Sequence, residues 1–479
     1  MVDNNFLETL FEKNEIVSQE EKNKFLSIIE EKNRKENVSK VIDSFSDKID
    51  LAKQIIEPRG LYAEEGSVVA KEFPPIMPLY YDNSGIWWKW SYAETKWDII
   101  DEVDLMNYIS FSSPANTINS KERSEILQAF KQVARQNKPL EVGYNYLQFK
   151  DEVINLETGD RFEASYKYFL TNPIPHKLSK ETETPTIDKI FTEWVGVNNV
   201  RLLKEIIAFC LLRDYPIHRI FCFIGAGMNG KSKYLELLRK FIGTGNCCST
   251  ELDTLINSRF EITRLHKKLV CQMGETNFNE MNKTSQLKKL SGGDLIGFEY
   301  KNKNPFEAIN YAKILIATNN LPATTDKTVG FYRRWVIIDF PNTFNEKKDI
   351  LSDIPEEEYG ALAMQSINTL IELLKNREFH NEGSIEERMK KYEDHSNPLE
   401  KFLKEYTVED FNGFIWKHDF SKKLNDWCKQ NRFRDISDVV IGKKMKELSI
   451  NQSLRSADWT AGKQFRAWIG IKFREETNN

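Results

Sequence analysis

The sequence lacks the long apolar runs, paired cysteines and leader pattern that mark membrane proteins and disulfide-rich secreted proteins. No stretch approaches the roughly 18 to 20 consecutive apolar residues that a membrane span needs, and the N-terminus shows no basic-then-apolar signal pattern. The six cysteines form no CxxC pair, and no histidine stands at metal-ligand spacing from them. These absences predict a cytoplasmic chain with reduced thiols, without membrane contact and without a zinc site.

A strong charge of one sign is also missing, since 68 Lys and Arg against 72 Asp and Glu leave a formal net charge of -4. The charges are unevenly distributed, because basic residues outnumber acidic ones in the C-terminal segment between Phe411 and Arg474. Such a segment can be a solvated face or can contact nucleic acid, and both interpretations stay open. Hydrophobic residues at 40% and charged residues at 29% predict a folded protein with apolar cores.

The chain of 479 residues is too long for one domain, because single cores stop growing at roughly 250 to 300 residues. Periodicity and composition predict a helical N-terminal region at 1–70, an α+β domain at 71–185, an α/β core at 186–345, a helical connection at 346–395 and a basic C-terminal domain at 396–479. A proline-containing stretch before residue 186 is expected to be a linker. For the N-terminal helices, a collar or partner-docking role is a hypothesis.

Aromatic residues gather in two short runs, Leu79–Tyr81 and Ile86–Trp90, with Asp82–Gly85 between them and Trp97 beyond. Asn and Gly in the intervening turn favour a β-hairpin. The tryptophans can form a stacking platform for single-stranded bases or the small core of a β-rich lobe, and the core is the favoured interpretation. A second β pair is expected from Tyr144–Leu156 and Arg161–Leu170.

A glycine-rich loop stands between an apolar strand, Ile220–Ile224, and an amphipathic helix. The loop reads G-x-x-x-x-G-K-S, and its residues are Gly225, Ala226, Gly227, Met228, Asn229, Gly230, Lys231 and Ser232. The glycines let backbone amides approach phosphates, and the helix adds its positive dipole end. Lys231 is expected to bind the β- and γ-phosphates of ATP, and Ser232 to ligate Mg²⁺.

A carboxylate, Glu275, follows the next strong strand candidate, Lys268–Met273. At the end of a strand beside a phosphate loop, a glutamate can polarise the attacking water with help from Mg²⁺. Glu275 is therefore the predicted base, and the alternative is an ordinary surface residue. The acidic neighbour usual at such a site is missing, because Gly274 occupies its place, and this weakens the case for direct coordination of Mg²⁺ by the protein.

A third apolar strand, Ala312–Ala317, ends in a polar turn that contains Asn319. An amide at such a strand tip can hydrogen-bond the γ-phosphate or the lytic water and so respond to the bound nucleotide. Asn319 is the candidate for this sensor role. The alternative is an asparagine that merely favours a turn.

Two adjacent arginines, Arg333 and Arg334, precede the strand Val336–Phe340. In an oligomeric ATPase, an arginine presented to the γ-phosphate of a neighbouring subunit stabilises the charge of the transition state. Arg334 is the favoured candidate for this arginine finger, followed closely by Arg333. An ordinary ion-pair site is the alternative.

Taken in order, these motifs resemble the helicase portion of phage and plasmid primase-helicases, relatives of the poxvirus primase-helicase within superfamily 3 of the AAA+ ATPases. The resemblance covers roughly residues 75 to 479 and includes Lys289–Asp294, the tryptophan region and Asp426–Cys428. It implies an AAA+ P-loop core with a parallel sheet, an α+β domain before it and a winged-helix-like domain after it. It also implies a ring, typically a homohexamer, that uses ATP and Mg²⁺ and translocates 3′ to 5′ on single-stranded DNA.

The same resemblance points to a DNA-contacting hairpin just before the sensor strand. In this chain the interval is Leu295–Tyr300, a polar tip and a return strand, with Lys301 and Lys303 at the tip. These lysines are the candidate DNA-binding residues, because they can grip phosphates without regard to sequence. The alternative is that they are ordinary loop lysines.

One departure from the family concerns primer synthesis. Many members carry a polymerase-like primase domain before the motor, and the N-terminal region here has neither the length nor an evident carboxylate constellation for one. No primer synthesis by this chain is expected, and a separate primase or replication initiator is an expected partner.

The favoured function is an ATP-dependent DNA helicase that acts on single-stranded and forked DNA in the replication of a mobile element in its host cell. The first alternative is an ATP-controlled DNA-binding origin melter or loader that does not travel along DNA. A P-loop ATPase acting on protein partners is the second alternative, and the basic C-terminal segment and the hairpin lysines argue against it.

Overall fold

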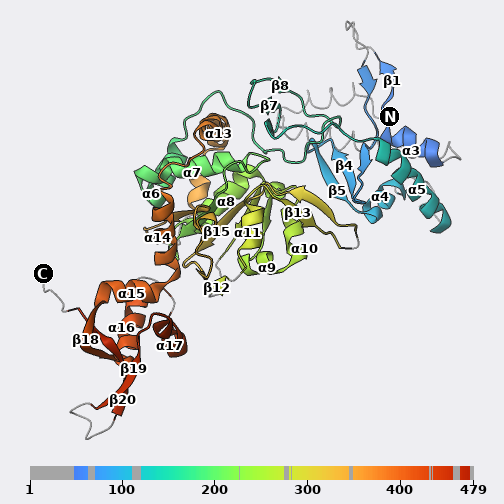
Figure 1. Cartoon of the computed structure of the whole chain (residues 1–479). Coiled ribbons are helices and arrows are strands. Elements are labelled where there is room, and N and C mark those ends of the chain that lie inside the picture. Colours follow the sequence, from blue (N-terminus) through green and yellow to red (C-terminus); the bar gives the residue numbers. More distant parts are fainter. Residues whose placement is uncertain are drawn as a thin grey trace. The chain divides into compact units, whose positions relative to one another are not determined.

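The computed structural model describes residues 48–62, 71–110, 120–225, 227–274, 280–281, 283–301, 303–344, 349–430, 433, 435–456 and 464–474. The chain divides into two compact units, Met1–Pro175 with Glu299–Phe306, and His176–Phe298 with Glu307–Asn479. Figure 1 shows the order of the elements along the chain. The finer division into five domains stays a prediction.

The first unit contains a helical core that covers one small sheet. Its helices are α3 (Lys48–Ile56), α4 (Glu102–Ser110) and α5 (Ser120–Gln136). Helix α5 buries Ile126, Ala129, Phe130 and Val133, at the three- and four-residue spacing of one helix face. These side chains share a core with Leu79 and Trp87. Of the charged helices expected before residue 58, only α3 lies within the described residues.

The predicted aromatic hairpin is confirmed. Strands β3 (Leu79–Tyr81), β4 (Trp87–Ser91) and β5 (Lys96–Ile100) form an antiparallel sheet. Trp88, Trp90 and Trp97 are each at most 3% exposed and pack in one cluster with Phe169. Because a base can stack only on an accessible ring, the stacking interpretation of these tryptophans is wrong and the core interpretation is confirmed.

The second expected β pair is confirmed in part. Strands β7 (Val153–Asn155) and β8 (Arg161–Phe162) are antiparallel, as predicted. Residues 144–156 do not form one strand, however, because β6 (Tyr146–Gln148) folds back onto β7. Strands β1 (Arg59–Tyr62) and β2 (Lys71–Phe73) form a separate antiparallel pair.

The second unit contains a five-stranded sheet in the order β10-β11-β15-β9-β17. Every pairing in it is parallel. The strands are β9 (Ile220–Ile224), β10 (Cys247–Ser249), β11 (Val270–Met273), β15 (Lys313–Thr318) and β17 (Trp335–Asp339). Strand β9 is entirely buried, as are β11 and β15, which is typical of a parallel sheet covered by helices. The predicted α/β class is confirmed.

Side-chain alternation along β9 assigns helices to the two faces of the sheet. Phe221 and Phe223 point to one face, where they contact Phe209 of α7 and Tyr234 of α8. On the other face, Trp335 of β17 packs against Tyr392 of α14. The helices concerned are α6 (Pro185–Val195), α7 (Val197–Cys210), α8 (Lys231–Ile242), α13 (Glu356–Asn376) and α14 (Ile385–Ser396).

The stretch before α6, expected to be a linker, is anchored to the second unit. His176 is 8% exposed, and its ring stacks between those of Phe241 and Tyr359, with centroid distances of 5.6 and 5.0 Å. Ser179 donates its backbone N–H to the carbonyl of Gly360 at 3.3 Å. From His176 onward the segment is therefore fixed irregular structure.

Shorter elements connect the sheet strands of the second unit. They are α9 (Leu252–Asn257), α10 (Arg259–Ile262), β12 (Glu280–Met281), α11 (Ser285–Leu290), β13 (Leu295–Phe298), β14 (Phe306–Ile309), β16 (Ala323–Thr324) and α12 (Val329–Tyr332), with 3-10 turns at Thr244–Asn246, Thr263–Leu265 and Ile350–Asp353. Strands β12 and β16 pair with each other, as do β13 and β14.

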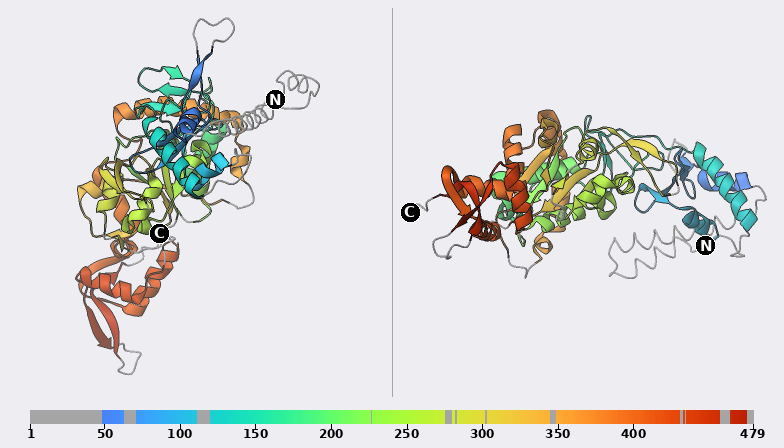
Figure 2. Two further views of the ribbon diagram at one scale, coloured as in Figure 1. Left: turned by 90° about the vertical axis from the view of Figure 1, so that its right-hand side faces the viewer. Right: turned by 60° about the horizontal axis from the view of Figure 1, so that its bottom comes forward.

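The C-terminal part has its own apolar core. It consists of α15 (Pro398–Tyr406), β18 (Thr407–Trp416), α16 (Lys417–Gln430), α17 (Asp438–Glu447), β19 (Gln452–Ser456) and β20 (Gln464–Phe473). The three strands form an antiparallel sheet in the order β18-β20-β19. Figure 2 gives two further views of the ribbon, in which the helices of this part lie beside its strands. Helix α16 packs on one face of the sheet, where Phe420 and Trp427 share the core with Trp468.

Among the described helices, none combines the length and the apolar character that a membrane crossing requires.

Candidate functional site

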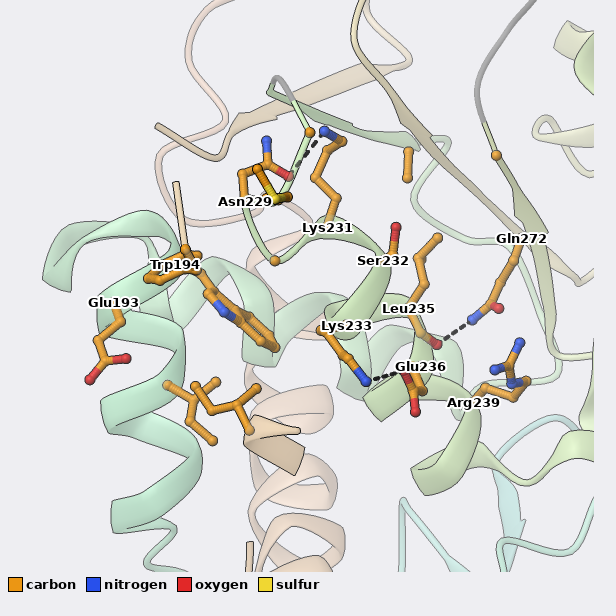
Figure 3. Close-up of a pocket in the computed structure, with 18 of the residues that line it drawn as sticks. Glu193, Trp194, Asn229, Lys231, Ser232, Lys233, Leu235, Glu236, Arg239 and Gln272 are labelled. Carbon is orange, nitrogen blue, oxygen red and sulfur yellow. Dashed lines mark hydrogen bonds and ion pairs between the residues drawn. The ribbon is translucent and has the colours of Figure 1, made fainter. Parts of the chain in front are cut away.

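The glycine-rich loop lies at the carboxyl end of β9, in the interior of the parallel sheet. Strands β15 and β17 flank β9, and the chain leaves β9 for the distant strand β10. A parallel sheet binds ligands at such a point, where the strand order reverses beyond the carboxyl ends. A cavity of about 1500 Å³ opens there, and loop residues 227–232 line it together with residues of α6, α8, β11 and β15 (Figure 3).

Two glycines of the loop are required by space. Gly230 has a φ of 95°, and a Cβ at this position would lie 2.6 Å from the indole of Trp194. A Cβ at Gly225 would lie 2.5 Å from the carbonyl oxygen of Phe340. At Gly227, by contrast, a Cβ would meet no atom within 4 Å. The loop is thus pressed against β17 and α6 at both ends and is open at its middle.

Trp194 reaches the loop from α6. This helix has a proline at its first turn and buries Ile187, Ile190, Phe191 and Trp194 along one face. Its N-terminal amides, those of Thr186 and Ile187, each donate a 3.1 Å hydrogen bond to the buried carboxylate of Glu358. A carboxylate at the positive end of a helix is favourable, so α13 fixes the position from which Trp194 packs under the loop.

Lys231 is held by three oxygen acceptors on different parts of the site. Its Nζ donates to the Gly225 carbonyl, to Asn229 Oδ1 at 3.1 Å and to Asn319 Oδ1 at 3.3 Å. Asn229 in turn donates its Nδ2 to the Phe340 carbonyl at 3.3 Å. Lys231 is 6% exposed and is among the residues that line the cavity (Figure 3), so this charge is buried at the cavity wall.

The loop has the chemistry of an anion site. Gly230 precedes the twelve-residue helix α8, whose N-terminal amides and dipole favour negative charge, and the ammonium of Lys231 lies beside them. Ser232, in the first turn, is exposed and lines the cavity. The clashes at Gly225 and Gly230 show that the backbone itself forms the cradle. These residues fit a polyphosphate, and the Ser232 hydroxyl fits a phosphate-bound Mg²⁺.

Asn319 lies where the sequence predicts it. It follows the last residue of β15, the strand adjacent to β9, and its side chain reaches Lys231. The amide oxygen points toward the loop, and Asn319 also lines the cavity. The structure therefore brings together Lys231 and Asn319, which are 88 positions apart in the sequence.

Two predicted site residues, Ala226 and Glu275, lie outside the described residues. Strand β11 ends at Met273, and Met273 and Gly274 line the cavity. Within the part of the chain that the structure describes, no cluster of three or more His, Cys, Asp or Glu side chains is suited to hold a metal ion. The role of Glu275 stays a prediction.

The two arginines differ in exposure, and the structure reverses the order of preference between them. Arg334 is 7% exposed, and its guanidinium donates to Ser291 Oγ at 3.2 Å, to the Lys288 carbonyl at 3.3 Å and to the Gly330 carbonyl. Burial and the neighbouring Arg333 lower the pKa of Arg334. Arg333 is exposed. A finger must reach another subunit, so this geometry favours Arg333 over Arg334, contrary to the preference drawn from the sequence.

The expected hairpin is present as β13 and β14, with Lys301 and Lys303 exposed at its tip. Residues 299–306 belong to the first unit, where Tyr300 and Phe306 pack against the aromatic cluster around Trp88 and Trp97. The rings of Tyr300 and Phe306 stack with a centroid distance of 6.2 Å. The base of the tip is thus fixed by aromatic packing, while both lysine side chains face solvent.

Sequence reasoning missed several residues of the cavity. Trp194 and the carbonyl of Phe340 shape the loop through tertiary contacts that no spacing reveals. Gln272 of β11 is 7% exposed and donates to the Leu235 carbonyl of α8 at 2.8 Å, which ties the strand before Gly274 to the helix after the loop. Charged side chains also line the cavity, namely Lys189, Glu193, Lys233, Glu236, Arg239 and Asp353. A buried glutamine within an apolar strand was the one available signal.

Comparison with known proteins adds the following findings. Residues 223–334 match a family of unknown function, DUF5906. Two solved apo structures of the C-terminal region of NrS-1 resemble this chain at 14% identity, with TM-scores of 0.41 and 0.45. Both matches cover 82% of this chain and 96% of that chain.

Proposed function

We propose that this chain is an ATP-dependent DNA helicase, built on an AAA+ P-loop core of superfamily 3, that serves the replication of a phage, virus or plasmid. The observation that carries the proposal is the hydrogen bond between Lys231 and Asn319 at the carboxyl ends of β9 and β15, two adjacent parallel strands. A loop lysine and a strand-tip amide at one point provide the contacts that a γ-phosphate needs.

The ATP and Mg²⁺ roles are assigned residue by residue. Backbone amides from Gly225 to Gly230 surround the phosphates, Lys231 neutralises their charge and Ser232 ligates Mg²⁺. Glu275 activates the lytic water, and Asn319 orients it or senses the γ-phosphate. The support for this assignment is the loop geometry, the burial of Lys231 and the 3.3 Å contact between Lys231 and Asn319.

The proposal also includes assembly into a homohexameric ring, in which a neighbouring subunit provides an arginine to each ATP site. In the proposal an arginine from the next subunit, Arg333 in preference to Arg334, stabilises the transition-state charge. The exposure of Arg333 and the internal bonds of Arg334 support this choice. The order strand, two helices, two strands after α15 supports a winged-helix-like C-terminal domain.

DNA contact is assigned to the hairpin tip. Lys301 and Lys303 are exposed and are the proposed phosphate contacts on single-stranded DNA, along which the ring travels 3′ to 5′. We expect forked DNA as the substrate and a separate primase or replication initiator as a partner.

The decisive test of ATP chemistry is ATPase activity of the full chain with and without single-stranded DNA. Lys231→Ala is expected to lower DNA-stimulated hydrolysis by about 100-fold or more, and Glu275→Gln by a similar factor with retained ATP binding. Lys240→Ala is the matched control, because Lys240 lies on the same helix, is outside the cavity lining and pairs with Glu356 at 3.6 Å. Undiminished hydrolysis by Lys231→Ala would contradict the assignment.

A forked duplex with direction-specific tails separates a helicase from an origin melter or loader. The proposal expects strand separation that needs a 3′ single-stranded tail and ATP hydrolysis. ATP-dependent DNA binding with melting confined to a few base pairs, and no tail dependence, would instead identify the melter. The Lys301→Ala/Lys303→Ala variant should bind DNA more weakly than the parent and keep its oligomer mass.

A further inference from the structure

Within the described residues, the helices that share the C-terminal core pack on the face of its antiparallel sheet that carries Ile415 and Trp468. Ile415 and Trp468 point into the core, so their strand neighbours Phe414, Trp416 and Ala467 point to the opposite face. Cross-strand register adds Arg455 and Phe465, which pair directly on β19 and β20. We call Phe414, Trp416, Arg455 and Phe465 the aromatic face.

The rings of the aromatic face contact one another in a row. Phe414 and Trp416 are edge-to-face with a centroid distance of 5.1 Å, and Trp416 and Phe465 are edge-to-face at 6.1 Å. Phe414 is 37% exposed and Phe465 46% exposed. Trp416 is partly exposed. Three large aromatic rings on the adjacent strands β18 and β20 are thus accessible together, which differs from scattered surface hydrophobic residues.

An arginine accompanies these rings. The guanidinium carbon of Arg455 lies 4.6 Å from the centroid of the Phe414 ring, so this charge is held against the aromatic face. Lys417 lies on the other face of the sheet, where its Nζ is 4.0 Å from the ring centroid of the core residue Trp468. Arg455 thus supplies positive charge on the aromatic face itself.

We propose that the aromatic face binds single-stranded nucleic acid by stacking bases on its rings. Accessible rings on two adjacent strands, with an arginine 4.6 Å from the centroid of one ring, match the way in which single strands are bound without sequence preference. Protein interfaces also concentrate aromatic and arginine side chains, so association between copies of this chain is one of the outcomes that the test distinguishes. This inference concerns a surface apart from the ATP cavity and stands without the helicase proposal.

The test measures binding of a fluorescent oligothymidylate of about 16 nucleotides, an upper site size for one small stacking domain. The full chain is used, in the Lys301→Ala/Lys303→Ala background so that the proposed hairpin contact does not mask the result. Phe414→Ala and Phe465→Ala are each expected to weaken binding between about 5- and 150-fold. Phe411→Ala is the matched control, because Phe411 lies on the same strand, is 98% exposed and is outside the cluster.

Salt dependence distinguishes stacking from charge. Loss of a ring should leave the slope of log affinity against log salt unchanged, whereas Arg455→Ala should reduce its magnitude by about 0.7. Oligouridylate should behave like oligothymidylate, and a blunt duplex should bind no more weakly to Phe465→Ala than to the parent. Thermal unfolding of each variant, unchanged from the parent, excludes loss of the fold as the cause.

Three outcomes would overturn the inference. Equal affinity of the parent, Phe411→Ala and Phe465→Ala for single strands shows that the rings do not bind bases. Equal losses for duplex and single strand show a purely electrostatic surface. A change in sedimentation of Phe465→Ala with unaltered nucleic-acid binding shows that the face joins copies of this chain.

Discussion

The indole of Trp194 occupies the space in which a side chain at position 230 would stand, because a Cβ on Gly230 would lie 2.6 Å from its Cδ1 and Nε1 atoms. Both atoms are rigid parts of a ring that is 1% exposed and packed against Phe191 and Phe340. Gly230 also has a φ of 95°, which L side chains adopt with strain. Helix α6 therefore restricts position 230 of the glycine-rich loop to glycine.

This relationship predicts that Gly230→Ala lowers the melting temperature by several degrees, since strain and overpacking each cost about 1 to 3 kcal/mol. Nucleotide affinity should fall with it, because the loop must shift. Gly227→Ala is the control, as its Cβ would meet no atom within 4 Å, and it should melt like the parent. Differential scanning calorimetry of the three proteins decides the matter, and equal melting temperatures would refute the packing argument.

Asn319 is predicted to act in hydrolysis more than in binding. Asn319→Ala removes the amide that meets Lys231, so the ATPase kcat should fall by about 100-fold or more while the dissociation constant for ATP changes only a few-fold. Asn320→Ala is the neighbouring control and should keep near-parent kcat. Equal weakening of ATP binding and turnover by Asn319→Ala would assign it to ground-state binding.

The two arginines should separate into a structural and a functional residue. Arg334→Ala leaves buried acceptors without their donor and should lower the free energy of unfolding by about 2 to 3 kcal/mol. Arg333→Ala should change it by no more than about 0.5 kcal/mol, as expected of a surface position, and yet abolish DNA-stimulated hydrolysis. Urea unfolding and ATPase assays on both variants provide the measurement.

A mixing experiment tests whether Arg333 acts on a neighbouring subunit. Arg333→Ala subunits mixed with Lys231→Ala subunits should recover part of the ATPase activity, because some sites then pair an intact loop with an intact arginine. Absence of recovery in rings whose mixed composition is verified by mass would argue that Arg333 does not act in trans.

Lys313 at the start of β15 predicts a pH dependence of stability. Burial lowers the pKa of this amine to about 7, and its Nζ donates to the carbonyls of Leu212, Asp214 and Tyr311. An unfolded lysine titrates near pH 10.4, so between about pH 7 and pH 10 the unfolded chain binds a proton that the folded chain lacks. Raising the pH through this window therefore stabilises the fold by up to about 1.4 kcal/mol per pH unit.

The matched variant for this prediction is Lys313→Met, which keeps an apolar stem and has no titrating group. The difference in stability between the parent and Lys313→Met should shift in favour of the parent as the pH rises from about 7 to 10, and stay constant below about pH 7. Thermal melts of both proteins across this range measure the slope. A difference independent of pH would mean that the three carbonyls keep the ammonium charged.

The sequence predicted the elements that carry the site more accurately than their surroundings. The run Ile220–Ile224 is β9 to the residue, and the loop after it lies beside Asn319 as expected, because parallel strands place their carboxyl ends at one edge. Local sequence patterns are sufficient to predict a buried strand and the glycine-rich loop that follows it. The favoured interpretation of the tryptophan cluster as a small core is also confirmed.

What the sequence could not provide depends on contacts between distant residues. Nothing in the pattern around Trp194 shows that it lies under Gly230, since the contact depends on α6 being anchored by Glu358. The difference in exposure between Arg333 and Arg334 was out of reach for the same reason, because adjacent residues at a helix end point in different directions and only the fold shows which is buried. The segment at His176 was predicted to be a linker because the sequence does not show its partners. These are Phe241 and Tyr359, which lie on helices remote in the sequence.

Helix α14 joins two parts of the second unit that the sequence treats separately. Two hydrogen bonds join the turn after Asn319 to α14. The Leu321 amide donates to the His395 carbonyl at 3.2 Å, and the Tyr392 hydroxyl donates to the Pro322 carbonyl at 2.9 Å. The end of β17 also contacts α14, through an ion pair between Asp339 and Lys391 at 2.7 Å.

Only Asn397 separates α14 from α15, the first helix of the C-terminal part. The strand tip beside the glycine-rich loop therefore contacts the helix that leads, through Asn397, into the C-terminal part. Asn397 has a φ of -135° and a ψ of 72°, so the helical path is interrupted at this residue. A displacement of the strand tip has to be absorbed by the Leu321 and Pro322 hydrogen bonds, by α14 or at Asn397 before it reaches the C-terminal part.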